Sequence, residues 1–322
     1  MMKTQTPPRA LAYPDPADES IEPLETPLML EARDRTLAAH RRRGQFVGWF
    51  GRSGVGKTTT GEWFKDRCNA DADVGVPRAF RAAHFTMPVV RRWGNPEKQA
   101  LGALFDGVTE TPLDVRDYRW KSQREIAHLI AQYAVTNNIQ MIFIDEAGRL
   151  CPEALEGILL FLNMVAAPPY DLPCTIVLIG MHDLPTTIDQ LPQVATRVSD
   201  TINFRPYTRR EAHALLRQVS PYFDALDPDA GEGARALDFV IEKTGGLVRS
   251  MLQLVERATR LADQFRRPLS MVSIMAVFEM KEHDHRSARD DAAHGYRGQI
   301  DVPSADDNED DGPAGVQGGS RR

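Results

Sequence analysis

Short apolar runs alternate along the chain with segments in which apolar residues recur every three or four positions. The runs have the length of strands that are buried on both faces, because they lack a regular polar alternation. They lie at residues 45–50, 81–90, 139–146, 174–180 and 201–204. Strands that alternate with helices predict an α/β fold in which a parallel sheet is sandwiched between helices.

Local helix signals fall between these runs. Ser122 and Glu125 have the spacing of a capping box, in which a hydroxyl and a carboxylate satisfy backbone N–H groups at a helix start. Pro152 suits the first turn of a helix and is followed by an apolar stripe at helical spacing. A further helix is expected at 28–42, where the segment ends in basic residues.

The pattern changes after Pro206, where the apolar runs stop and only helical patterns follow. Thr208 and Glu211 form a second capping-box pattern at the start of this part. Further helical patterns lie at 232–244, 247–264 and 270–282. We therefore expect a disordered arm at 1–26, an α/β domain at 27–206, a small all-helical domain at 207–283 and a disordered acidic tail at 284–322.

The composition is that of an ordinary globular protein, since 42% of the 322 residues are hydrophobic and 26% are charged. No apolar run approaches the ~18 residues that cross a bilayer, and the N-terminus lacks the apolar core of a signal peptide. Cys68, Cys151 and Cys174 are too scattered for a disulfide framework or a metal site. We therefore expect a cytoplasmic protein with no membrane partner.

The net charge of −6 is a poor guide to the folded surface, because much of it lies in the tail. Residues 284–322 hold nine Asp or Glu and five Arg, so this segment alone carries −4. The rest of the chain is close to neutral, and its overall charge does not exclude binding to nucleic acid.

A glycine-rich turn follows the run at 45–50 and opens a predicted helix. Its pattern is Gly51-x-x-x-x-Gly56-Lys57-Thr58. Glycines let successive backbone N–H groups face one phosphate, and the positive end of the helix adds to the attraction. Lys57 can reach the β- and γ-phosphates, and the Thr58 hydroxyl can ligate Mg²⁺. The expected nucleotide contacts are Gly51, Ser53, Gly54, Val55, Gly56, Lys57, Thr58 and Thr59.

Two carboxylates, Asp145 and Glu146, end the run at 139–146. At the carboxyl end of a strand, Asp145 can bind Mg²⁺ together with Thr58, directly or through water, and Glu146 can polarise an attacking water. An apolar strand that ends in acids is also common for structural reasons alone. Two adjacent carboxylates favour hydrolysis of a nucleotide over binding alone.

Two arginines occupy positions from which they can reach a bound nucleotide. Arg197 precedes the last strand, where it can contact the γ-phosphate held by a neighbouring subunit; such an arginine contributes ~10³–10⁵ to phosphoryl transfer in well-studied cases. Arg249 opens a helix in the all-helical part and can reach back to the nucleotide. The alternatives are a surface or ion-pairing role for Arg197 and a solvated helix position for Arg249.

The order of these motifs resembles that of the AAA+ ATPases. "GRSGVGKT" and "MIFIDE" lie in the α/β part, and "GGLVR" is similar to the second sensor of that superfamily, which belongs to a helical lid. With "IVLIGMHDL" following, the chain is most similar to the TniB/TnsC-type transposition ATPases, over residues 28–282. The resemblance implies an AAA+ P-loop NTPase fold with a small all-helical lid.

The resemblance also implies roles for individual residues. These are binding of ATP and Mg²⁺ by Lys57, Thr58 and Asp145, hydrolysis through Glu146, an arginine finger at Arg197 and a second sensor at Arg249. One departure concerns the first sensor, usually a small polar residue, where this chain has Met181 followed by His182. Methionine cannot position a water by hydrogen bonding, so either His182 substitutes or hydrolysis is slow.

The stretch 78–124 favours DNA binding, since it holds nine Lys or Arg and five acids. It resembles the part of the transposition ATPases that lines the channel of a helical oligomer, where contacts to phosphates give sequence-independent, salt-sensitive binding. The alternative is a solvated face of mixed charge. Trp93 and Trp120 can cover arginine stems or act as core or surface anchors. The expected DNA contacts are Arg91, Arg92, Lys98, Arg116, Arg119 and Lys121.

The resemblance predicts an ATP-dependent regulator of transposition. It would oligomerise on duplex DNA as a ring or filament, select a target and recruit a transposase, with a targeting factor as a further partner, and ATP hydrolysis would drive disassembly. Alternatives with the same core are a helicase loader and a secretion-associated ATPase. A P-loop kinase for a small metabolite is disfavoured by the helical module, whereas Met181 favours a nucleotide-locked scaffold. The acidic tail is either a docking peptide or a solubilising segment.

Overall fold

A five-stranded parallel sheet forms the centre of the protein. The computed structural model describes residues 24–42, 45–90 and 94–280. The strands are β1 (Gln45–Gly51), β2 (Arg81–Thr86), β3 (Ile139–Asp145), β4 (Thr175–Gly180) and β5 (Val198–Phe204), in the order β2-β3-β4-β1-β5. Every paired strand is parallel to its neighbour, so all carboxyl ends lie at one edge of the sheet.

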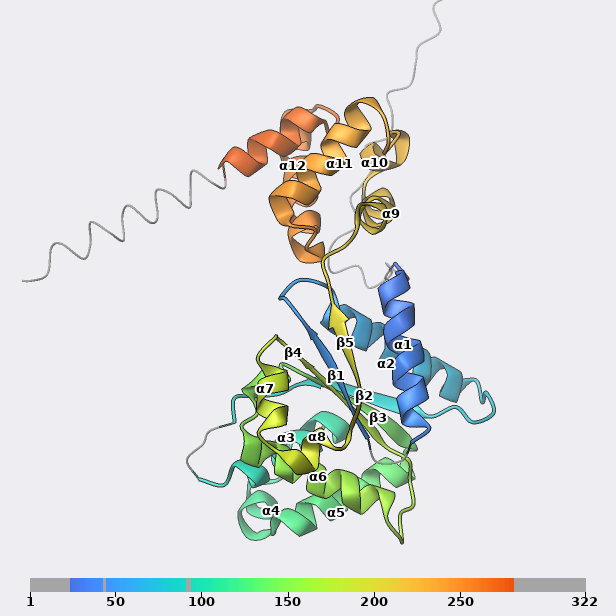
Figure 1. Ribbon diagram of the computed structural model, residues 1–322, viewed down its shortest axis with the longest axis vertical. Coiled ribbons are helices and arrows are strands. Elements are labelled where there is room, and N and C mark those ends of the chain that lie inside the picture. Colours follow the sequence, from blue (N-terminus) through green and yellow to red (C-terminus); the bar gives the residue numbers. More distant parts are fainter. Residues whose placement is uncertain (1–23, 43–44, 91–93, 281–322) are drawn as a thin grey trace, which may run out of the picture.

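Helices cover both faces of this sheet and then form a separate layer (Figure 1). They are α1 (Pro27–His40), α2 (Lys57–Asp73), α3 (Pro96–Thr109), α4 (Val115–Trp120), α5 (Gln123–Thr136), α6 (Pro152–Ala166), α7 (Leu184–Asp189), α8 (Pro192–Ala195), α9 (Arg209–Val219), α10 (Pro221–Ala225), α11 (Gly231–Thr244) and α12 (Val248–Gln264). A 3₁₀ turn spans Ala147–Arg149, and residues 271–280 are also helical. Helices α1 and α2 cover one face, and α3, α5 and α6 cover the other.

Side chains of the central strands alternate between two hydrophobic cores. On β4, Ile176 and Leu178 belong to the core under α3, α5 and α6, while Val177 and Ile179 belong to the core under α1 and α2. All four side chains are fully buried. A strand buried on both faces has no polar side to show, which explains the continuous apolar run in the sequence.

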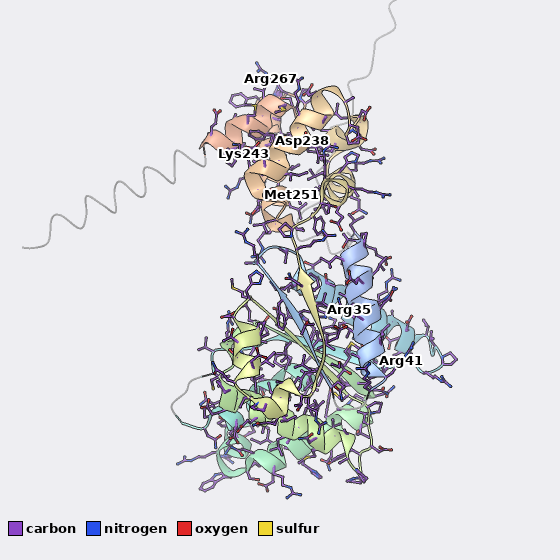
Figure 2. The ribbon with its side chains drawn as sticks, viewed as in Figure 1. Arg35, Arg41, Asp238, Lys243, Met251 and Arg267 are labelled. Carbon is purple, nitrogen blue, oxygen red and sulfur yellow. The ribbon has the colours of Figure 1, made fainter. Side chains whose placement is uncertain are left out.

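Polar contacts attach α1 to the sheet. The indole N–H of Trp49 on β1 donates to the Thr36 hydroxyl at 3.2 Å. Arg35 of α1 (labelled in Figure 2) donates from Nε to Asp200 on β5 at 2.9 Å. Its Nη2 donates to the Thr201 carbonyl at 2.9 Å. The Arg35 guanidinium holds the pKa of the Asp200 carboxyl below its ordinary value. These contacts hold α1 against β1 and β5, the strands that lie at this edge of the sheet.

The helices after Pro206 enclose a third hydrophobic core and form the helical lid. Met251 and Lys243 both belong to this part (Figure 2), and Met251 is fully buried. The ammonium of Lys243 lies over the rings of Phe239 and Phe278, at 5.8 and 5.6 Å from their centroids. An ammonium above two aromatic faces is attracted by their negative π-surfaces. The lid therefore has its own packing, apart from that of the sheet.

Both predicted capping boxes are present, at Ser122 and at Thr208. The strand predicted at 81–90 is shorter in the structure, where β2 ends at Thr86. Beyond β2, the Met87 N–H still donates to the Asp145 carbonyl of β3 at 2.9 Å. Pro88 then has no N–H with which to continue the pairing of the two strands. The edge strand β5 instead begins earlier than the expected 201–204, since an edge position tolerates its polar residues.

Helix α3 was not predicted and is part of the core. Asn95 caps it by accepting from the Lys98 N–H at 2.9 Å, and Pro96 occupies its first turn. Leu101 and Leu104 are fully buried beneath α6. The basic stretch 78–124 therefore contains a buried helix as well as exposed charge. The expected arm and tail lie largely outside the described residues, since only 24–26 of the arm are described.

The close approach of α3 and α6 leads to a stability prediction. A Cβ at Gly157 of α6 would lie 2.6 Å from the Glu97 carbonyl oxygen and 3.0 Å from the Glu97 Cα. Because these are backbone atoms, Gly157→Ala must push the helices apart, and we expect a loss of about 1–3 kcal/mol in the free energy of unfolding. Urea denaturation measures this loss. Asn163→Ala, at an exposed position of the same helix, is the control and should leave the unfolding midpoint almost unchanged.

Candidate nucleotide site

The glycine-rich turn joins β1 to α2 and takes a shape that other residues disfavour. Gly54 and Gly56 have φ values of 82° and 96°, in the left-handed region where a Cβ is strained. Gly51 packs so closely on β5 that a Cβ there would lie 2.4 Å from the Phe204 carbonyl oxygen. Gly56 caps α2, so the N-terminus of a long helix opens from the turn. These glycines allow the turn that the sequence pattern predicts.

Lys57 is buried and lies over its own turn. Its Nζ donates to the carbonyls of Gly51 at 2.8 Å and Arg52 at 2.9 Å. Burial lowers the pKa of the ammonium, while the charges of Asp145 and Glu146 raise it and that of Arg249 lowers it further. Hydrogen bonds to carbonyls compensate only part of the lost hydration of an ammonium. A polyphosphate beside Lys57 would supply the missing negative charge.

Thr58 and Asp145 come together from α2 and β3. The Thr58 hydroxyl donates to Asp145 Oδ2 at 2.6 Å, and Asp145 Oδ1 accepts the Glu146 N–H at 2.7 Å. A hydroxyl beside a carboxylate is the kind of oxygen pair that holds Mg²⁺ when phosphates and waters complete the shell. Within the described residues there is no cluster of three His, Cys, Asp or Glu that would hold a metal without such a ligand.

Glu146 leaves the end of β3 in a left-handed conformation, with φ of 54°. This conformation costs energy for a residue other than glycine and turns the chain sharply into the 3₁₀ helix at Ala147–Arg149. The Glu146 side chain is 54% exposed and has Arg149 Nε 3.9 Å from its Oε2. Arg149 in turn donates from Nη1 to the Met87 carbonyl at 3.0 Å. Arg149 therefore links Glu146 to the segment that follows β2.

The lid reaches the glycine turn through the start of α12. Gly245 ends α11 in the left-handed region, and the Gly246 carbonyl accepts the Tyr207 N–H at 2.9 Å. Three residues after Gly246, the backbone N–H of Arg249 donates to the Gly54 carbonyl at 3.2 Å. A Cβ at Gly54 would lie 3.4 Å from the Arg249 Cβ. The double glycine thus lets α12 begin against the phosphate turn.

A cavity of about 270 Å³ lies between these parts. Its lining comes from the turn and α2, from the ends of β3 and β4, and from α12. The residues are Ser53, Gly54, Gly56, Lys57, Thr58, Thr59, Asp145, Glu146, Gly180, Met181, Val248, Arg249 and Leu252. Sequence reasoning missed Gly180, Val248 and Leu252. Val248 and Leu252 are four residues apart at the start of the helix that carries Arg249, and this spacing indicates that they share one helix face.

Met181 lines the cavity directly after β4, at the position that the resemblance assigns to the first sensor, and is 52% exposed. Its thioether is at best a weak acceptor and has no N–H or O–H to donate. His182 follows but does not belong to the lining. The geometry therefore gives no support to a replacement of the sensor by His182.

Two predicted nucleotide contacts do not line the cavity. Val55 is buried in the core under α1 and α2, where it anchors the turn, and Gly51 offers its carbonyl to Lys57. Arg197 is also remote from it. The Phe46 N–H donates to the Arg197 carbonyl at the amino end of β1, about 17 Å along the strand from Gly51. An arginine side chain cannot span that distance, so Arg197 does not reach the cavity of its own chain.

The predicted DNA contacts lie away from the cavity. Lys98 is on α3, and Arg116 and Arg119 are on α4. Helix α4 lies at the end of the α/β part that is distant from the lid (Figure 1). Lys121 follows α4 directly. Arg91 and Arg92, with Trp93, lie outside the described residues. The described part of the chain contains no helix that is long and apolar enough to cross a membrane.

The parallel sheet of this order, the phosphate turn after β1, the acids that end β3 and the helical lid together define the AAA+ P-loop fold. Residues 40–188 match a family model described as an AAA domain. Among solved structures, ORC2 of Aeropyrum pernix in ADPNP–ADP complexes has a TM-score of 0.59 at 18% identity, covering 81% of this chain and 70% of that chain.

Two further solved structures have the same fold at a similar level of sequence identity. ORC1 of Aeropyrum pernix in complex with DNA has a TM-score of 0.52 at 18% identity, covering 84% of this chain and 68% of that chain. Cdc6p of Pyrobaculum aerophilum has a TM-score of 0.54 at 17% identity, covering 77% and 65%. A search of curated proteins found no significant match.

Proposed function

We propose that the protein is an ATPase that assembles on duplex DNA and regulates transposition in the manner of the TniB/TnsC-type ATPases. ATP completes the interface between neighbouring copies, the assembly marks a target for a transposase, and hydrolysis releases the copies. The proposal treats the chain as a switch whose assembly depends on the bound nucleotide.

The observation that carries the proposal is the cavity shared by the phosphate turn and the lid. It combines an ammonium, a hydroxyl–carboxylate pair and a half-exposed glutamate with residues of α12. A ligand that contacts both parts stabilises one arrangement of the lid over others by its differential affinity. Such a cavity suits a nucleotide that controls shape, and the helical lid in this position disfavours the alternative of a small-molecule kinase.

The chain's own residues have separate tasks in this proposal. The N–H groups of the turn and Lys57 bind the phosphates, and Thr58 with Asp145 would hold Mg²⁺, which supplies charge neutralisation for phosphoryl transfer. Glu146 orients and polarises the attacking water. Arg249 contacts the nucleotide from the lid, and Arg197 acts on the site of a neighbouring copy.

Binding to DNA is supported by the exposed cations of α4 and by the likeness to ORC1, a protein solved in complex with DNA. The role in transposition is supported by the order and sequence of "GRSGVGKT", "MIFIDE", "IVLIGMHDL" and "GGLVR". A second candidate with the same core is a helicase loader. Recovery of a helicase rather than a transposase in a pulldown distinguishes the two candidates.

Assembly on DNA is the direct test. With ATP or a non-cleavable analogue, the full chain is expected to form DNA-bound oligomers visible by electron microscopy, and with ADP it should stay monomeric. Lys57→Ala removes the ammonium from the phosphate site, so nucleotide affinity should fall at least about tenfold and the oligomers should disappear. Lys65→Ala, on the same helix but outside the cavity, is the control. Monomers at saturating analogue and DNA would contradict the proposal.

Met181 favours a variant of this function with slow turnover. A methionine beside the phosphates gives no N–H or O–H that holds the attacking water, so the assembled state would be long-lived. Measured turnover with and without DNA separates a cycling ATPase from a nucleotide-locked scaffold.

A further inference from the structure

Trp120 is the most exposed of the large hydrophobic side chains in the described ranges, with 80% of its surface accessible. It ends α4, the short helix between α3 and α5. A tryptophan in water leaves a large apolar surface unburied, and tryptophan is enriched at contact surfaces, where its ring and its N–H both find partners. Its neighbours decide which kind of contact it suits.

The packing of Tyr118 directs Trp120 outward. The Tyr118 ring lies on Gly102 of α3, where a Cβ would come within 2.9 Å of it, and under Lys98, whose Nζ is 5.2 Å from the ring centroid. Two residues further along a helix, a side chain points to nearly the opposite side. Tyr118 therefore anchors α4 on the core while Trp120 faces solvent. Arg116, four residues before Trp120, shares this outward face.

One cation contacts the exposed ring, and further cations lie close to Trp120 in the sequence. The guanidinium of Arg119 lies 5.6 Å from the Trp120 ring centroid, and Arg116 and Arg124 are exposed on either side in the sequence. Lys121 follows directly and helps to line a surface hollow of about 390 Å³ at the start of α5. An aromatic ring among cations offers stacking and phosphate contacts within the span of one nucleotide.

Two acidic residues of this region are engaged at helix starts. Asp114 accepts the backbone N–H of Arg116 at 2.7 Å, and Glu125 accepts both the N–H and the hydroxyl of Ser122 at 2.7 Å. Their charges serve the caps of α4 and α5. Arg116, Arg119, Lys121 and Arg124 outnumber these two carboxylates, so the described charges near the ring are cationic on balance, which suits a nucleic acid better than the hydrophobic core of a protein interface.

We infer that Trp120 is a stacking site for an unpaired base of DNA, with Arg116, Arg119 and Lys121 contacting the adjacent phosphates. This inference rests on the proposed binding of DNA and deepens it. Intact duplex offers its bases only at the groove edges, so a ring outside the helix contacts only the backbone. Stacking on Trp120 therefore gives a preference for DNA that is single-stranded or locally unpaired.

The test compares three DNA ligands of equal length: a duplex, the same duplex with a central unpaired bubble, and a single strand. Fluorescence anisotropy is recorded with the full chain and a non-cleavable ATP analogue. Wild type should bind the bubble more tightly than the duplex. Trp120→Ala should lose about tenfold in affinity for the bubble and the single strand and keep its affinity for the duplex. Trp120→Phe should restore most of the loss because it keeps an aromatic face.

A second readout is independent of affinity. Trp49 and Trp63 are buried, so a bound base cannot stack on them. Quenching of tryptophan emission by oligo(dT) that is present in wild type and absent in Trp120→Phe belongs to Trp120, whereas quenching that persists in Trp120→Phe belongs to Trp93. Val272→Ala, at an exposed apolar position of the lid, is the control for loss of exposed apolar surface.

The outcomes separate this inference from the proposed function. If wild type binds no DNA with any nucleotide, both fail. If wild type binds duplex and Trp120→Ala weakens all three ligands equally or none of them, the stacking site is overturned and the proposed function stands. If Trp120→Ala binds every ligand as wild type but loses a protein partner, the surface belongs to that partner instead.

Discussion

Glu146→Gln is expected to lower the rate of ATP hydrolysis by at least about 10²-fold while nucleotide binding stays intact. The amide keeps the size of the side chain at the end of β3, and the backbone N–H of residue 146 still donates to Asp145. It removes the negative charge that polarises water. Release of phosphate under saturating ATP measures the rate, and fluorescence of a labelled nucleotide measures binding.

The same substitution should prolong the assembly on DNA, because hydrolysis is the step that releases subunits in the proposed cycle. Glu153→Gln, on α6 outside the cavity, is the matched control and should hydrolyse ATP at the wild-type rate. Unchanged hydrolysis in Glu146→Gln would show that the Glu146 carboxylate takes no part in the hydrolysis step. Lost binding would show instead that it holds the nucleotide.

Arg197→Ala is expected to lower DNA-stimulated hydrolysis by about 10³-fold in assembled protein. Arg197 lies at the amino edge of the sheet, while the cavity lies at the carboxyl edge. The residue therefore contributes only if it enters the cavity of a neighbouring copy. Nucleotide binding by isolated Arg197→Ala should match wild type, since its own cavity is complete.

A mixing experiment makes this geometry testable. Arg197→Ala copies keep Glu146, and Glu146→Gln copies keep Arg197. Where two such copies meet in the right order, one complete site forms, so the mixture should hydrolyse ATP faster than either variant alone. No rescue at any ratio, together with intact oligomers, would show that Arg197 does not act across an interface.

The sheet and the phosphate turn are predictable because their causes are local. A strand buried on both faces must be apolar throughout, and β3 and β4 show this directly. The turn needs glycine at Gly54 and Gly56 for conformational reasons that any homologous turn shares. Helix α3 is absent from the sequence-based prediction because the many charges of 78–124 favour an exposed surface, although Asn95 and Pro96 mark the start of a helix and Leu101 and Leu104 have helical spacing.

The cavity is less predictable, because contacts between distant segments shape it. No local pattern shows that the Arg249 N–H meets the Gly54 carbonyl, or that Val248 and Leu252 complete the wall. Nor does sequence indicate that Glu146 adopts a left-handed conformation. The pairing of β5 with β1 places Arg197 beside Phe46, at the edge of the sheet opposite the cavity.

The bond between Arg249 and Gly54 uses main-chain atoms on both sides. Substitutions at position 249 other than proline can therefore remove the guanidinium from the cavity without breaking this link between the lid and the glycine turn. The side chain of residue 249 can therefore change in evolution while its main-chain hydrogen bond to Gly54 is kept. A related protein that has lost this arginine would still hold its lid against the glycine turn.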